Sequence, residues 1–403
     1  MGLRSPVALA GVVGVGVPVL AAGVVAGLTI KTGETGPYPT SASTESTSST
    51  PTATLQAAPV VAPVVADPVG FQPDSINFIS ADEGWALGRT YPCASEPCQS
   101  LRHTTDGGRT WQAVTLPAPL LPNSPTHDTN ARGWVKFADA RNGWVGVDGT
   151  LFATHDGGKS WKQVPLDINA VMGDFTLTVA EDSAYIAATQ PGEKTVLFTS
   201  PVDSDSWTET TDLPVAVGGG PDPSAAVTVV GTRAWVVVTN RTRSGARLVD
   251  GTWSPWKLPC GGNGPADWHA LSERRVLALC GRPGPAQNDS ATTHLMTSTD
   301  GGATFTDTGQ LAPSLANDAV LMPADASHLV AALDDRVLTS ADGGESWTIA
   351  YTAPDRDWEP VAGEFTTETT GFVILAHTGS AHNASMMLTT DDAGRTWTPV
   401  SFG

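Results

Sequence analysis

Three acidic residues, which lie in two long stretches between apolar segments, are of the type that catalyses the hydrolysis of glycosidic bonds. Asp128 lies in Leu116–Gly133, and Asp357 and Glu359 lie in Ala350–Gly363. Glycoside hydrolysis needs two carboxyl groups about 5–10 Å apart, one as acid and the other as base or nucleophile. Spacing along the chain does not set that distance. The three residues are therefore catalytic candidates only if the fold brings the two stretches together.

The same two stretches place aromatic side chains beside charged ones, and so does the pair Trp268 and His269 at the start of the fifth repeat unit. Aromatic faces next to arginine, histidine and carboxylate groups suit a sugar ring or a peptide. The alternative is that each tryptophan packs inside the fold, along an inner strand. The candidate ligand-binding residues are His127, Arg132, Trp134, Trp268, His269, Arg356 and Trp358.

The four cysteines form two local pairs, Cys93 with Cys98 and Cys260 with Cys280. Four cysteines allow three connectivities, and the local pairings are favoured because each closes a loop within one repeat unit. Disulfides are typical of an oxidising compartment. A metal site would need a cluster of cysteine and histidine ligands that this spacing does not supply, so we expect no metal and no cofactor.

One short pattern, hydroxyl-x-Asp-x-Gly-x-hydroxyl-aromatic, recurs along the chain and supplies the frame for these residues. Full copies occupy Thr104–Trp111, Thr154–Trp161, Ser298–Phe305, Ser340–Trp347 and Thr390–Trp397. Two weaker copies end at Trp207 and Trp253. Successive terminal aromatics lie 42 to 52 residues apart. A period of this length with several short strands per unit predicts a seven-bladed β-propeller.

Each full copy predicts a tight hairpin turn. Glycine reaches positive φ at little steric cost, and an aspartate carboxylate accepts hydrogen bonds from the backbone of its own turn. The terminal aromatic is large enough to fill the space between adjacent sheets. We therefore assign structural roles to Asp106, Asp156, Asp300, Asp342 and Asp392, and to Trp111, Trp161, Phe305, Trp347 and Trp397.

A second pattern precedes each turn, in which two alternating apolar strands flank a short turn, as in Ser75–Gly88. Each unit is thus predicted as strand A, turn, strand B, variable loop, strand C, box turn and strand D. Residues 70–403 should be all-β, with seven four-stranded antiparallel blades. The box turns should lie on one rim, and the D–A and B–C loops on the other. The ring closes either without a shared strand or with Val64–Val69 as an outer strand.

The N-terminal part predicts a hydrophobic helix followed by a linker. Between Arg4 and Lys31 lie 26 uncharged residues, enough to cross a bilayer, which needs about 20. Residues 1–31 are therefore a signal anchor or, if cleaved, a signal peptide. Residues 32–69 are rich in Ser, Thr, Pro and Ala, which predicts a disordered linker. In both cases the propeller is extracytoplasmic, either anchored to the cell membrane or secreted.

The formal net charge of −19 narrows the range of partners. A negative field of this size argues against binding to nucleic acid or to anionic lipid headgroups. We expect a monomeric propeller with a protein or glycan ligand. It would contact the membrane only through the N-terminal helix, if that helix is uncleaved.

On its repeated turns the chain resembles the Asp-box (BNR) repeats of sialidases. With the strand pattern seen in Phe137–Trp144, it looks most like the propellers related to photosystem II assembly factors. The resemblance covers residues 70–403 and implies the propeller fold. A sialidase would add an arginine trio, a Tyr nucleophile paired with Glu, and an Asp acid/base. The early Phe/Tyr-Arg-Ile-Pro segment has no match, and the best remaining pair is Tyr351 with Glu359 or Glu364.

A complete structural repeat beside an incomplete catalytic set favours a non-catalytic binding scaffold, since fold alone does not imply activity. The leading hypothesis is an extracytoplasmic, membrane-tethered propeller that binds a protein or a glycan. The alternative is a glycoside hydrolase of exo-sialidase type, acting from the loops opposite the box turns. A purely architectural stalk-and-head protein is the third hypothesis.

Overall fold

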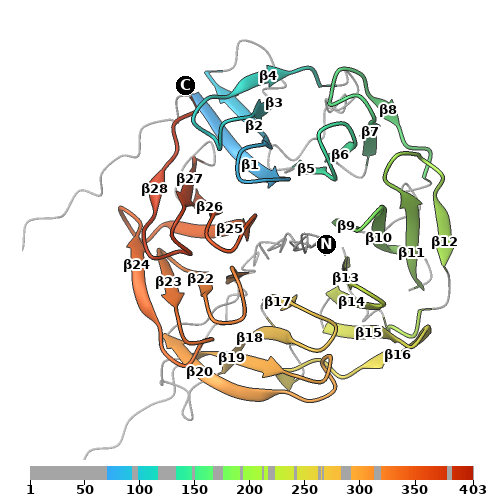
Figure 1. Ribbon diagram of the computed structural model, residues 1–403, viewed down its shortest axis with the longest axis vertical. Helices are drawn as coiled ribbons and strands as arrows, with labels where there is room; N and C mark the ends of the chain where they lie inside the picture. Colours follow the sequence, from blue (N-terminus) through green and yellow to red (C-terminus); the bar gives the residue numbers. More distant parts are fainter. Residues whose placement is uncertain are drawn as a thin grey trace, which may run out of the picture. The chain divides into compact units, whose positions relative to one another are not determined.

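The computed structural model contains a ring of seven four-stranded antiparallel sheets, the blades of a β-propeller (Figure 1). It describes residues 70–92, 99–116, 133–147, 150–166, 176–190, 194–210, 213–216, 223–239, 243–261, 265, 267–282, 292–312, 319–378 and 384–402. The predicted all-β, seven-bladed architecture is confirmed. The predicted N-terminal helix and linker lie outside the described residues. No helix of the described part has the length and apolar character that crossing a bilayer requires.

Each blade consists of four consecutive strands, so the chain completes one blade before it starts the next. The first blade comprises β1 (Gly70–Phe78), β2 (Gly84–Tyr91), β3 (Gln99–Thr104) and β4 (Gln112–Val114). The second comprises β5 (Trp134–Phe137), β6 (Gly143–Val147), β7 (Thr150–Thr154) and β8 (Lys162–Gln163). The third comprises β9 (Thr176–Ala180), β10 (Ser183–Gln190), β11 (Lys194–Pro201) and β12 (Thr208–Thr210).

The remaining blades follow the same order. The fourth comprises β13 (Ser224–Val230), β14 (Arg233–Thr239), β15 (Arg243–Val249) and β16 (Thr252–Trp256). The fifth comprises β17 (Asp267–Ala270), β18 (Val276–Arg282), β19 (Thr292–Ser298) and β20 (Thr306–Ala312). The sixth comprises β21 (Val320–Pro323), β22 (Leu329–Leu333), β23 (Arg336–Ser340) and β24 (Thr348–Thr352). The seventh comprises β25 (Trp358–Phe365), β26 (Gly371–His377), β27 (Ser385–Thr390) and β28 (Thr398–Pro399).

The hydrophobic core is divided among the seven seams between neighbouring blades. The aromatic residue at the end of each box turn packs at the seam with the preceding blade. Trp161 of the second blade, for example, joins the cluster of Trp85 and Phe137. Trp85, Trp144 and Trp235 are fully buried. Because each sheet buries both faces against its neighbours, no single blade has a core of its own.

The ring closes without a shared strand among the described residues, since β1–β4 and β25–β28 pair only within their own blades. Side chains join the two blades instead. The Asn77 amide donates to Glu364 Oε1 at 3.2 Å, and the Arg102 guanidinium donates to the Phe402 carbonyl at 2.8 Å. The Phe71 and Phe402 rings lie 4.8 Å apart. The alternative with Val64–Val69 as an outer strand falls outside the described residues.

Polar side chains form hydrogen bonds with the backbone groups at the unpaired edges of the innermost strands. An innermost strand has one neighbour in its sheet, so backbone groups on its other edge lack ladder partners. Asn77 Oδ1 in β1 accepts the Phe137 N–H of β5 at 2.7 Å, and Asp267 Oδ2 in β17 accepts the Leu321 N–H of β21 at 2.8 Å. Neighbouring blades are therefore held in register at the centre of the ring as well as through their cores.

The box turns share one set of hydrogen bonds. In the first blade, the Thr104 hydroxyl accepts the Gly108 N–H at 3.0 Å and donates to Asp106 Oδ1 at 2.8 Å. Asp106 also accepts the Thr110 hydroxyl at 2.7 Å and the Thr110 N–H at 2.9 Å. Because these two donors favour the ionised carboxylate, the pKa of Asp106 falls to about 2. The same bonds hold the turns at Asp156, Asp300, Asp342 and Asp392.

In the same five blades each box turn is tied to the A–B turn beside it. The residue after the box aspartate donates its N–H to an A–B turn carbonyl, as Gly107 does to Asp82 at 2.8 Å. Equivalent bonds of 2.7 to 2.9 Å join Gly157 to Arg141, Gly301 to Arg274, Gly343 to Ser327 and Ala393 to Thr369. We call this edge of the ring the box rim. The opposite edge, formed by the D–A and B–C loops, is the loop rim.

The predicted pairing of Cys260 with Cys280 is present as a disulfide within the fifth blade. It ties the segment before β17 to β18. Cys93 and Cys98 lie outside the described residues, so their pairing stays a prediction.

Candidate functional site

The first predicted stretch, Leu116–Gly133, falls almost entirely outside the described residues. His127, Asp128 and Arg132 belong to that part. Their roles therefore stay predictions, and so does any pairing of Asp128 with a carboxylate of the seventh blade.

The structure corrects the predicted aromatic platform at the fifth blade. Trp268 is only 6% exposed and packs against Trp256 with ring centroids 5.2 Å apart. His269 is also buried, and its Nε2 lies 3.5 Å from Asp267 Oδ2. Both residues belong to β17, an innermost strand that neighbouring blades cover. They are interior residues, because the side chains of an innermost strand pack at the seams with its neighbours.

Trp134 is half-buried at the start of β5. Its ring covers Gly146 so closely that a Cβ atom there would meet Trp134 Cε2 at 2.4 Å. It packs with the hydrophobic cluster between the second and third blades. This residue therefore fills space beside a glycine that has no side chain, and the side of its ring toward Gly146 is covered.

The second predicted stretch does reach the surface. Arg356, Asp357 and Glu359 are exposed in the D–A loop before β25 and at the start of that strand. Trp358 between them is half-buried and packs against the cluster of the sixth and seventh blades. Of the seven predicted ligand-binding residues, Arg356 is thus the one that the described part exposes.

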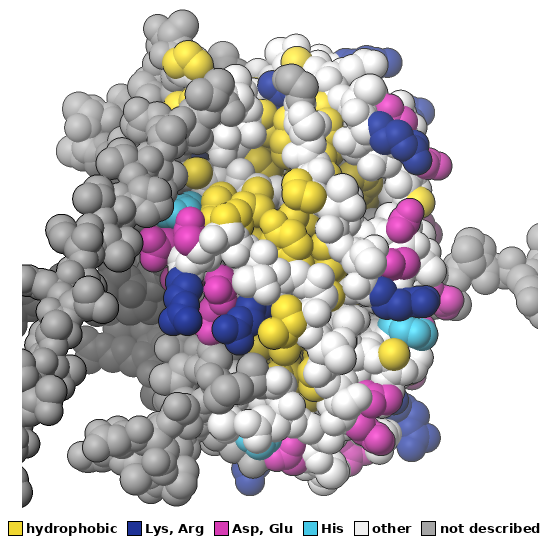
Figure 2. Space-filling view, turned by 90° about the vertical axis from the view of Figure 1, so that its left-hand side faces the viewer, with side chains coloured by type: hydrophobic (Ala, Val, Ile, Leu, Met, Phe, Trp, Pro, Cys, Tyr) yellow, Lys and Arg dark blue, Asp and Glu magenta, His cyan; other side chains and the backbone are white. Residues whose placement is uncertain are grey.

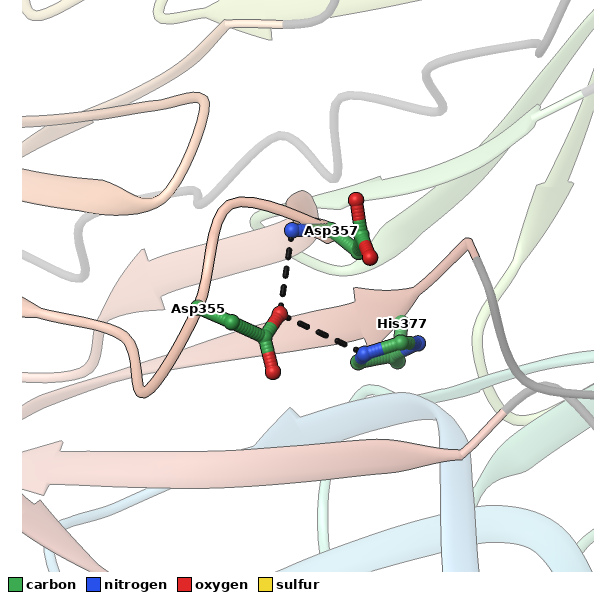
Figure 3. A group of neighbouring side chains, drawn as sticks. All are labelled: Asp355, Asp357 and His377. Atoms are coloured by element: carbon green, nitrogen blue, oxygen red, sulfur yellow. Dashed lines mark hydrogen bonds and ion pairs between the residues drawn. The ribbon is translucent and has the colours of Figure 1, made fainter. Parts of the chain in front are cut away.

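Asp355, Asp357 and His377 come together at this point of the loop rim (Figure 3). Their donor atoms all lie within 4.8 Å of one another. His377 Nε2 lies 3.3 Å from Asp355 Oδ1, and the same oxygen accepts the Asp357 N–H at 3.0 Å. His377 is buried, Asp355 is half-buried and Asp357 is exposed. The group therefore has a fixed interior end and an accessible outer end.

Backbone and ring contacts hold the two segments of this group together. The Asp357 carbonyl accepts the Thr378 N–H at 2.7 Å and the Thr378 hydroxyl at 3.1 Å. Trp358 and His377 are opposite each other in the β25–β26 register, and their rings meet edge-on at 5.1 Å. Sequence analysis missed His377, because a single histidine at the end of an apolar strand is no signal for a site.

Of the two glutamates predicted as the sialidase partner of Tyr351, the structure does not pair Glu364 with it, and the pairing with Glu359 stays a prediction. Tyr351 lies in the outer strand β24, where its hydroxyl donates to the Met386 sulfur at 3.8 Å. Glu364 lies in the inner strand β25, where it accepts from Asn77 and lies 3.5 Å from Lys136 Nζ. The two side chains have different partners on different strands, so this nucleophile and glutamate do not form a catalytic pair.

A cavity of about 340 Å³ opens on the box rim at the seam of the first and seventh blades. Several of its hydroxyls are already used inside their own turns. Thr396 donates to Asp392 at 2.7 Å, Thr390 donates to the same carboxylate at 2.9 Å, and Thr366 donates to the Thr370 carbonyl at 3.2 Å. Two box turns thus share one cavity, which our prediction of purely local turns had not included.

The outer side of the sixth and seventh blades shows a band of hydrophobic side chains between charged ones (Figure 2). Ile349 in β24 is the large hydrophobic residue that the described part leaves exposed, at 57%. Single exposed apolar residues are normal on monomeric proteins. Ala350 and Tyr351 of the same strand are half-buried and pack against the core cluster between these blades.

No protein-family model and no curated protein matches the chain. Among solved structures it is similar to YCF48 bound to a D1 peptide, with a TM-score of 0.53 and 18% identity, over 81% of this chain and 95% of that one. YCF48 from Cyanidioschyzon merolae has a TM-score of 0.55 and 16% identity, over 78% and 96%. A PL25 ulvan lyase has a TM-score of 0.52 and 10% identity, over 83% and 97%. These similarities establish the propeller fold, which hosts both binding proteins and enzymes.

Proposed function

We propose that the chain is an extracytoplasmic, membrane-tethered and non-catalytic propeller that binds a partner protein through the loop rim of its seventh blade. The observation that carries this proposal is that hydrogen bonds fix the conformation of the D–A loop before β25. Hydrogen bonds to Asp355 and from Thr378 hold the backbone at Asp357, while Arg356 and Asp357 are exposed. A loop already held in one conformation loses little entropy when it binds, which favours affinity.

Protein is a better candidate than glycan as the ligand. A sugar ring is recognised by an exposed aromatic face. Trp268 is buried, and Trp134 and Trp358 are half-buried against their own clusters. The accessible groups of the seventh-blade loop are charged instead, and charged groups at an interface mainly determine partner choice and association rate.

Two further observations support the proposal. The Cys260–Cys280 disulfide fits an oxidising, extracytoplasmic compartment. A propeller of similar fold, YCF48, has been solved with a D1 peptide, so peptide binding is within the range of this architecture. The recurrence of the same turn hydrogen bonds in five blades also supports assigning the chain to the Asp-box propellers. The tether rests on the sequence of residues 1–31.

Site-specific photocrosslinking in intact cells tests the binding role. A photoreactive phenylalanine replaces Arg356 on the loop rim or, as a matched control, Glu345, which is exposed in a box turn. We expect a discrete crosslinked protein from position 356 and none from position 345. Crosslinks of equal yield at both positions, or none at position 356, would contradict the proposal. Turnover of a fluorogenic glycoside panel by the purified chain would contradict its non-catalytic part.

A further inference from the structure

The group on the seventh blade differs from the other histidine–acid contacts in the described part, because two carboxylates face one imidazole. The other contacts have one carboxylate each, and they are His103–Glu83, His155–Asp205, His269–Asp267, His294–Asp307 and His328–Asp325. We infer that Asp355, Asp357 and His377 form a binding site for a divalent transition-metal ion, with zinc as the best match.

The spacing of the donor atoms fits such an ion. Zinc binds nitrogen and carboxylate oxygen at about 2.0–2.2 Å in tetrahedral geometry, which places two donors about 3.4 Å apart. His377 Nε2 and Asp355 Oδ1 are already 3.3 Å apart. The whole set lies within 4.8 Å, and Asp357 is exposed, so its carboxylate can rotate toward the other two without moving the backbone.

The donor types favour a transition metal over calcium. One imidazole and two carboxylates form the mixed nitrogen and oxygen set that zinc accepts, whereas calcium takes oxygen ligands. Three protein ligands leave a fourth position open on the exposed side, where Asp357 lies. A divalent ion also neutralises the repulsion between two neighbouring carboxylates, which the single-carboxylate contacts elsewhere do not have.

The surrounding structure holds the ligands in place. Trp358 meets the His377 ring edge-on and restricts its orientation. The Asp357 N–H donates to Asp355, and Thr378 donates twice to the Asp357 carbonyl. Contacts of this kind, which orient the metal ligands, typically change metal affinity 10–100-fold. A bound ion would crosslink the D–A loop to the end of β26 on the loop rim.

Zinc titration of the purified, chelator-treated full chain tests this inference, and it involves no partner protein. By isothermal titration calorimetry we expect one zinc ion per chain and, by differential scanning calorimetry, a melting temperature that rises with zinc concentration. Asp357→Asn should lower zinc affinity at least about tenfold, since it removes a ligand. His377→Gln should abolish binding. His294→Gln, which breaks a one-carboxylate contact, should leave zinc affinity unchanged.

Three outcomes would overturn the inference. No stoichiometric uptake would mean that the group is an ion pair only. Equal zinc affinity in the wild type, Asp357→Asn and His377→Gln would place the zinc elsewhere. Calcium binding that survives His377→Gln would identify a carboxylate site without the imidazole. Circular dichroism controls for folding, and Asp357→Asn keeps the test decisive if the buried His377→Gln variant fails to fold.

Discussion

The box rim repeats one arrangement in five blades, whereas the loop rim of the seventh blade carries a group that no other described blade repeats. On the box rim, aspartates accept hydrogen bonds from their own turns, and the residue after each aspartate donates its N–H to the neighbouring A–B turn. On the loop rim, Asp355 and Asp357 come from the D–A loop before β25, and His377 comes from the end of β26. A repeated local arrangement is explained by stability, but a unique arrangement of converging side chains needs another reason.

The third and fourth blades show that the box arrangement is one solution among several. In the fourth blade, Asp250 and Gly251 both have positive φ and form a two-residue hairpin between β15 and β16. In the third, the Ser200 hydroxyl donates to the Ser204 carbonyl at 2.8 Å. Two other turns thus also join strands C and D, so the box arrangement is not required to close a blade.

The largest effect should come from a glycine of the box rim. Gly344 has a φ of +96°, and a Cβ atom there would meet Leu295 Cδ2 at 2.1 Å. Gly344→Ala combines backbone strain with overpacking and should lower the free energy of unfolding by about 2–4 kcal/mol, measured in urea. Gly251→Ala is the control, since φ there is +74° but no atom lies within 4 Å. Equal losses in both variants would show that packing at the box rim contributes little.

A box hydroxyl should have the next largest effect. The buried Ser298 hydroxyl accepts the Gly302 N–H at 2.8 Å and donates to Asp300 at 2.8 Å. Ser298→Ala leaves a buried N–H without its partner, which should cost about 1–3 kcal/mol in unfolding free energy. Ser254→Ala in the fourth blade, where the hydroxyl makes one bond of 3.5 Å, should cost less. If Ser298→Ala had no measurable effect on unfolding free energy, the conclusion that the box rim serves stability would not hold.

A smaller effect should depend on pH. Bonds from the Ser160 hydroxyl and N–H lower the pKa of Asp156 from 3.8 to about 2. A carboxyl group whose pKa is lower in the folded than in the unfolded state stabilises the protein at any pH above the unfolded-state pKa. This contribution is lost as the pH falls from 3.8 toward 2. The melting temperature of the wild type should therefore be higher than that of Asp156→Asn at neutral pH, and the difference between the two should shrink below about pH 4. A difference that stays constant down to pH 2 would exclude this linkage.

The smallest effect on stability should come from the loop rim. Arg356 is exposed and Asp357 ends in an exposed carboxylate, so Arg356→Ala and Asp357→Asn in metal-free protein should change unfolding free energy by less than about 0.5 kcal/mol. Arg356→Ala should still reduce partner binding. If these substitutions cost as much as the box-rim changes, the loop rim would be a structural element, and the functional contrast between the rims would fail.

Sequence reasoning reached the blade number and the turn positions but only part of the site. It identified the D–A loop with Arg356 and Asp357, because charged residues in a long connection stand out from the repeat. It overestimated Trp268 and His269, since alternation along a strand does not show which neighbouring blade covers a side chain. It also missed the bond from each full box turn to its A–B turn, which joins residues 16 to 27 positions apart in the sequence.

The amino-acid sequence by itself determined the make-up of the ring. A box turn is complete within eight residues, because its glycine, aspartate and hydroxyls act on their own backbone, so each copy can be read directly. Only the tertiary structure decided what meets on the loop rim. The register of β25 with β26 brings His377 close to Asp355 and Asp357. Neighbouring blades cover tryptophans that the sequence alone suggested as binding residues. Register and packing depend on contacts between distant segments, and no local pattern contains them.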